Sequence, residues 1–122
     1  MSALLKTKSK GGLLRRYDII EAILNSDFEG VKKAIEEDAY CVNSVHEPSN
    51  MNAPMLSSAG RLPEFLDEIL KAGSIIDFGY RDDLGNDLLD AAMQSADHQI
   101  VEKVQAAFQQ FAPHIINNWP EP

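Results

Sequence analysis

The side chains that could do chemistry in this sequence are few and lie far apart. The three histidines, His46, His98 and His114, lack the spacing of a metal-binding pair, and the single cysteine, Cys41, has no CxxC companion. Residues 57–60 place two serines before a glycine, but they do not form the G-x-S-x-G turn that presents a serine nucleophile. We therefore expect no catalytic residues, no cofactor and no metal site.

Acidic residues gather in two segments without forming a recognisable site. Residues 82–87 contain three aspartates, but they lack the alternating acidic ligands and the closing glutamate of an EF-hand loop. The acidic side chains of 36–38 are adjacent in sequence, and at a helix end such a run is expected to be solvated. Because nothing pairs a nucleophile with a base, we do not expect an enzyme.

The charge of the chain is strongly uneven. Its net charge is −8, yet residues 1–16 carry five basic side chains and no acidic one. The other 106 residues therefore hold six basic and nineteen acidic side chains, a balance of −13. Such a body repels phosphate backbones, which argues against nucleic-acid binding and favours a protein partner with a basic surface. We expect residues 1–16 to form a flexible basic arm.

Cysteine usage and hydropathy indicate the compartment. A single cysteine excludes an internal disulfide and fits a reducing environment. No apolar run approaches the roughly 20 residues that a membrane span needs, and residues 1–16 lack the continuous apolar stretch of a secretory signal. We expect a monomeric cytoplasmic protein that does not contact membranes.

An internal repeat of 35 residues organises the rest of the chain. The windows 27–35, 62–70 and 97–105 align with one another, and each has largely apolar residues at positions i, i+1, i+4 and i+5. This spacing predicts a helix with one buried stripe. A second helical segment precedes each window, at about 19–24, 53–59 and 87–95. The predicted unit is helix, short turn, helix and loop.

Local signals support these helices and their packing. Asp18 and Glu21 have the spacing of a capping box, and Asn52 precedes the second unit as an N-cap. Pro113 is expected to end the last long helix. At the 35-residue offset three small residues coincide, and we expect them to be buried between neighbouring helix pairs: Ala22, Ser57 and Ala92.

The loops and one long motif resemble a known family. Residues 43–51 and 77–86 are rich in turn-forming side chains. Residues 64–77 are similar to the ankyrin-repeat pattern E-I-V-x-x-L-L-x-x-G-A-D-V-N, and 85–92 resemble its G-x-T-P-L-H-x-A turn. Fainter versions lie at 36–43 and 53–56. The resemblance to the ankyrin family covers about residues 17–111.

The resemblance implies an all-α fold, a short ankyrin-like solenoid of helix-turn-helix repeats joined by hairpin-like loops. Three repeats, at about 17–43, 52–77 and 86–111, then form a domain over 17–116 with a C-terminal cap, between the arm and a tail at 117–122. We expect Ile115, Ile116 and Trp119 to fold back as the cap, with exposure of Trp119 to a partner as the alternative.

The resemblance also implies a non-enzymatic module that binds another protein. Ankyrin-like stacks usually bind through the loop tips and the concave face of the first helices. The positions that correspond to these surfaces are His46, Glu47, Leu56, Tyr80, Arg81, Asp82, Asp83, Asp90 and Gln94. For Tyr80 the alternative is packing through Phe78. Two roles stay open: an adaptor, or an immunity- or antitoxin-type inhibitor that neutralises a basic toxin or enzyme.

Overall fold

The computed structural model describes residues 17–116, which are mainly helical, as the sequence predicts. The α-helices of this part are α2 (Ile19–Leu24), α3 (Phe28–Glu37), α4 (Ala53–Ala59), α5 (Pro63–Leu70), α6 (Leu88–Ser95), α7 (His98–Phe111) and α8 (Pro113–Ile116). The shorter elements are the 3₁₀ turns η2 (Ala39–Asn43) and η3 (Gly73–Ile75) and the strands β1 (Val45–His46) and β2 (Met51–Asn52). The predicted arm and tail, 1–16 and 117–122, lie outside the described residues.

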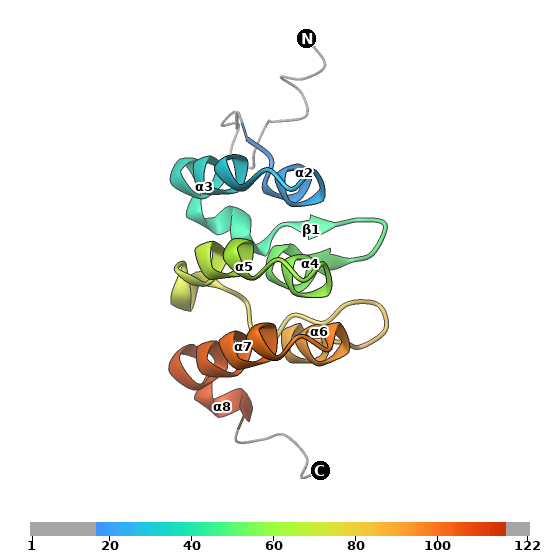
Figure 1. Ribbon diagram of the computed structural model, residues 1–122. Helices are drawn as coiled ribbons and strands as arrows, with labels where there is room; N and C mark the ends of the chain where they lie inside the picture. The colour runs from blue at the N-terminus through green and yellow to red at the C-terminus, as the bar shows by residue number, and fades with distance from the viewer. Residues whose placement is uncertain (1–16, 117–122) are drawn as a thin grey trace.

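The long helices form three pairs that stack in chain order (Figure 1). The inner helices α2, α4 and α6 lie in one column, and the outer helices α3, α5 and α7 lie in a second column beside it. The outer helices begin at Phe28, Pro63 and His98, so their starts are 35 residues apart. The period read from the apolar pattern is therefore the period of the helices.

Short polar side chains begin most of these helices by accepting orphan backbone N–H groups. Asp18 accepts the N–H groups of residues 20 and 21, and Asn52 accepts that of Met55 at 3.0 Å. The reciprocal capping box predicted for Asp18 lies elsewhere, at α6. There the Asp87 and Asp90 side chains each accept the other's backbone N–H. The third inner helix accordingly begins one residue after Asp87.

The small residues at the repeat offset are buried, as predicted. Ala22 is 7% exposed, while Ser57 and Ala92 are 0% exposed. α4, which carries Ser57, packs against α2 on one side and α6 on the other, so a larger side chain there would push the inner helices apart. Among residues 17–116 the Ser57 hydroxyl has no hydrogen-bond partner. The small size of Ser57 therefore matters for helix packing, whereas its hydroxyl makes no hydrogen bond within this range that would require a polar residue.

Side chains also tie each unit to the next through backbone groups. The amide of Asn43, at the end of the first unit, donates to the carbonyl of Ile75 at 2.9 Å and accepts the N–H of Asp77 at 2.8 Å. Arg61 Nε donates to the carbonyl of Ser95 at 2.9 Å. Each contact spans about one repeat, so it fixes how far one helix pair is offset from the next.

The last helices are arranged as predicted up to the limit of the described residues. α7 ends at Phe111, and Pro113 begins α8, which turns back beneath α7 (Figure 1). Ile115 is half-buried against the core, in keeping with the predicted cap. The Ile116 side chain and Trp119 lie outside the described part of the chain.

Candidate functional site

Two loops project on the same side of the stack, beyond the inner helices (Figure 1). In the first, β1 and β2 pair antiparallel, with Val45 opposite Asn52 and His46 opposite Met51. The second loop connects η3 to α6. We call residues 45–52 and 80–86 the loop platform. It contains six of the nine residues that the resemblance assigned to partner binding.

Tyr80 joins the two halves of the loop platform. Its hydroxyl donates to the backbone carbonyl of Asn50 at 2.6 Å, and the Asn50 side-chain amide donates to the Asp83 carboxylate. Burial raises the pKa of Tyr80 above its ordinary value of 10.0, and the nearby charges of Asp83 and Asp82 raise it further. Tyr80 therefore has an internal partner that the sequence did not reveal, and it holds the platform in one shape.

The second loop is closed by its own charged residues. The Asp82 carboxylate accepts the N–H groups of Leu84 and Asn86, both at 2.9 Å, and Arg81 Nη1 donates to the Gly85 carbonyl at 2.7 Å. The aspartate run that resembles a calcium loop at first sight is thus a turn that its own side chains organise. Asp82 remains half-buried, and Arg81 is exposed.

The first loop contributes an organised turn with one exposed acid. His46 Nδ1 lies 2.7 Å from the Ser49 hydroxyl, so this half-buried histidine helps to close the hairpin. Glu47, at the tip, is exposed. Glu47 and the exposed Asp83 together make the surface of the platform acidic. Internal hydrogen bonds fix the backbone of the loops that carry these two side chains.

The three helix positions predicted to contact a partner differ in what they offer. Leu56 is only 9% exposed and belongs to the core, so it presents little surface, contrary to its assignment as a contact residue. Asp90 is half-buried, and its carboxylate accepts the backbone N–H of Asp87 at 3.0 Å. Gln94 is exposed on α6. Asp90 thus caps α6. The sequence analysis did not predict this capping role, because a capping box normally has Glu or Gln at this position.

The paired carboxylates at the start of α6 shift the ionisation of Asp87. Burial raises its pKa above the ordinary 3.8. The backbone N–H that it accepts from Asp90 lowers the pKa, the Asp90 carboxylate raises it, and Arg81, 3.9 Å away, lowers it. The net direction is upward, so the folded protein holds a proton on Asp87 more tightly than the unfolded chain does.

This shift predicts a pH-dependent stability. The pKa of Asp87 is higher in the folded protein than in the unfolded chain, so protonated Asp87 favours the folded state. This contribution to the free energy of unfolding is complete below pH 3.8 and is lost as the pH rises through the folded-state pKa. Asp87→Asn keeps the N-cap acceptor and removes the charge. We expect its melting temperature, relative to wild type, to increase from acid to neutral pH. Calorimetry across that range tests this, with Asp27→Asn at the exposed cap of α3 as the matched control. A difference that does not change with pH would contradict the assignment.

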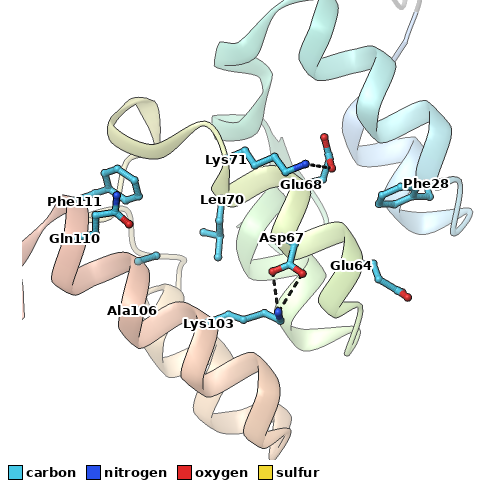
Figure 2. A pocket seen from close by; sticks show the side chains of 11 residues that line it. Phe28, Glu64, Asp67, Glu68, Leu70, Lys71, Lys103, Ala106, Gln110 and Phe111 are labelled. Atoms are coloured by element: carbon cyan, nitrogen blue, oxygen red, sulfur yellow. Dashed lines mark hydrogen bonds and ion pairs between the residues drawn. The ribbon is translucent and has the colours of Figure 1, made fainter.

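A second surface feature, not anticipated from the sequence, lies across the outer helices (Figure 2). It is an open groove of about 780 Å³ between α3, α5 and α7. Phe28, Glu64, Asp67, Glu68, Leu70, Lys71, Lys103, Ala106, Ala107, Gln110 and Phe111 line it. The lining includes no histidine, cysteine, serine or threonine.

The charged side chains of the groove are mostly paired with one another. Lys103 Nζ lies 2.9 and 3.0 Å from the two carboxylate oxygens of Asp67, and Lys71 Nζ lies 3.0 Å from Glu68 (Figure 2). The pair between Asp67 and Lys103 joins α5 to α7. Because these opposite charges are paired, the groove carries less uncompensated negative charge than the loop platform does.

Searches for other kinds of site and for similar proteins gave negative results. Within residues 17–116, no cluster of three or more histidine, cysteine, aspartate or glutamate side chains is placed to hold a metal ion. No helix in that range is long and apolar enough to span a membrane. Comparisons with models of protein families, with curated proteins and with solved structures found no match to this chain.

Proposed function

We propose that this chain is a short ankyrin-like repeat protein that binds a basic protein partner through its loop platform and performs no catalysis. One observation carries the proposal. The two loops on one side of the stack are joined by Tyr80, Asn50 and Asp83, and they present acidic side chains on a backbone held by hydrogen bonds. A surface that is ordered before binding loses less conformational entropy when a partner docks.

The repeat assignment is supported by three features of the fold. The outer helices start at intervals of 35 residues, hairpin-like loops separate the pairs, and side chains such as Asn43 bind backbone groups of the next unit. In stacks of this kind each unit contacts only its neighbours, which leaves the loop edge free for binding. An irregular helical bundle would give no reason for contacts to recur at one offset.

The partner chemistry is argued from charge. Residues outside the basic arm carry −13, and the exposed acids Glu47 and Asp83 lie on the platform. An acidic surface attracts a basic partner over several ångströms and speeds the encounter. We place this interaction in the cytoplasm, with the chain as a monomer, in keeping with a single cysteine, Cys41, which cannot form a disulfide within the chain.

The test removes charge without disturbing the loops. In the triple variant Glu47→Gln, Asp82→Asn and Asp83→Asn, each amide can still accept the hydrogen bonds that the carboxylate accepts. We expect association with the natural partner, recovered by affinity capture, to slow by on the order of tenfold at low salt and to lose much of its salt dependence. Surface plasmon resonance measures both, and the melting temperature should change little.

The matched control removes the same number of charges from the outer helices. Glu29, Glu36 and Glu64 are exposed there, and their replacement by glutamine should leave the association rate nearer to that of wild type. If the control slows association as much as the platform variant does, binding depends on overall charge and the platform is not the site. If neither variant matters while Leu70→Lys abolishes binding, the partner docks in the groove.

A further inference from the structure

The groove across the outer helices arises where the third unit departs from the repeat. α7 has 14 residues, whereas α3 has 10 and α5 has 8. Because the outer helices start at the same repeat position, residues 106–111 of α7 extend past the end of α5. Four of the residues that line the groove belong to this extension: Ala106, Ala107, Gln110 and Phe111. The two shorter outer helices stack without such an extension, so stacking alone does not account for the groove.

One glycine explains why α5 stops where α7 continues. Gly73 has a φ of +61°, a left-handed conformation that does not continue a helix. The residue one repeat later is Phe108, which is buried and lies within α7. Gly73 also makes room for α7, because a Cβ atom there would lie 2.9 Å from Cε1 of Phe111. The Phe111 ring therefore closes one end of the groove against η3.

The ion pair between Asp67 and Lys103 bounds the apolar part of the groove on its other side. Leu70 and Ala106 follow these two residues by three positions, so they lie about one turn further along α5 and α7. In Figure 2 the Leu70 side chain points from α5 toward the turn of α7 that carries Ala106. The methyl group of Ala106 leaves space that a longer side chain would fill, and Leu70 stays only half-buried. The surface between the ion pair and the Phe111 ring is thus apolar and hollowed.

The rim of the groove carries one acid that no lysine neutralises. Lys103 and Lys71 pair with Asp67 and Glu68, whereas Glu64 is exposed and forms no ion pair within residues 17–116. Three carboxylates and two ammonium groups give the lining a net charge of −1. A cationic side chain beside the apolar surface is therefore attracted to this rim.

We propose that the groove binds an amphipathic helix of a partner protein, one whose apolar stripe is flanked by lysine or arginine. The stripe covers Leu70, Ala106 and Phe111, and a basic side chain meets Glu64. A groove between two helices accepts a third helix, because the side chains of the third enter between the ridges of the first two. This surface lies on the side of the stack away from the loop platform, and the inference does not depend on the proposed function (Figure 1).

Other occupants match the groove less well. An added strand needs an unpaired strand edge, and the strands within residues 17–116 are two residues long and lie on the side of the loops. The acidic body repels a membrane surface of anionic lipids. A second copy would bring another charge of −13 against the first. A basic amphipathic helix matches the groove both in its apolar stripe and in its charge.

Designed peptides test both parts of the proposal on the full chain. The probe is a fluorescein-labelled helical peptide with leucines on one face and lysines on the other. One comparison peptide has glutamates in place of the lysines, and a second has the same composition as the probe with its leucines distributed around the helix. Fluorescence anisotropy should show the probe binding at least about tenfold more tightly than either comparison peptide, a difference that burial of one leucine side chain can provide.

Substitutions on α7 and α5 show whether the probe lies in the groove. Ala106→Arg fills the space opposite Leu70 and should remove the preference for the probe over the peptide with distributed leucines. Gln105→Arg adds the same charge at an exposed position of α7 outside the lining, so it is the matched control and should retain the preference. Glu64→Gln should weaken probe binding by roughly two- to fivefold at low salt, as expected for an exposed ion pair.

Three outcomes would overturn the inference. No binding of the probe, or equal binding of the two lysine peptides, would show that the groove does not recognise an apolar stripe. A preference that Ala106→Arg leaves unchanged would show that the probe docks elsewhere, and amide chemical-shift changes at 45–52 and 80–86 would then place it on the loop platform. Equal binding of the glutamate peptide would refute the predicted charge of the partner. Circular dichroism melts of each variant confirm that the comparison is between folded proteins.

Discussion

Replacing Ala92 with glutamate is expected to unfold this protein or to leave it marginally folded. Ala92 is 0% exposed on α6, and this helix packs directly on α4, where Ser57 is equally buried. Glutamate would overfill the contact and place an unpaired carboxylate in it, at a cost of about 3–5 kcal/mol. Domains of this size are stable by only about 5–15 kcal/mol, so most of the margin would be lost.

Thermal denaturation followed by circular dichroism measures the effect of Ala92→Glu. For a domain of this size, each kcal/mol lowers the melting temperature by roughly 4–8 °C. The control is Ala106→Glu, the same substitution at an exposed position of α7, which should shift the melting temperature by only a few degrees. Equal melting temperatures for the two variants would mean that α6 does not pack on α4 as described.

The second large effect is expected from Asn43→Ala, which removes no apolar surface. The substitution leaves the Ile75 carbonyl and the Asp77 N–H without the amide that now binds both. Losing two such hydrogen bonds at a half-buried site costs about 1–3 kcal/mol, the lower end applying if water replaces Asn43. Because the bonds join the first unit to the second, we expect broader as well as earlier unfolding.

Chemical denaturation with amide hydrogen exchange tests this prediction. Exchange should accelerate first in η3 and at the N–H of Asp77, where the lost contact lies. Asn86→Ala is the matched control, since within residues 17–116 the one hydrogen bond of the Asn86 side chain is a long contact of 3.4 Å with Gln94. A variant of Asn43 as stable as the Asn86 variant would show that this amide does not tie the units together.

The helices and their spacing could be predicted from the sequence because both depend on nearby residues. An apolar stripe and a capping side chain act within a few positions of one another, as at Asp18 and Asn52. The repeat of 35 residues follows from the same local pattern found three times. Even the burial of Ala92 could be expected, since a small residue recurring at that offset is explained by close packing.

The candidate site depended on contacts that no local pattern specifies. The Tyr80 hydroxyl meets a carbonyl thirty residues away, and Lys103 meets Asp67 thirty-six residues away, because stacking brings those segments together. The ankyrin resemblance assigned Leu56 to a partner-binding surface, yet its place beside the neighbouring helices makes it a core residue. The sequence by itself thus determined which segments are helical and at what interval they recur. Tertiary packing alone decided which polar side chains are committed to internal bonds and which remain free on the surface, because that depends on distances between units.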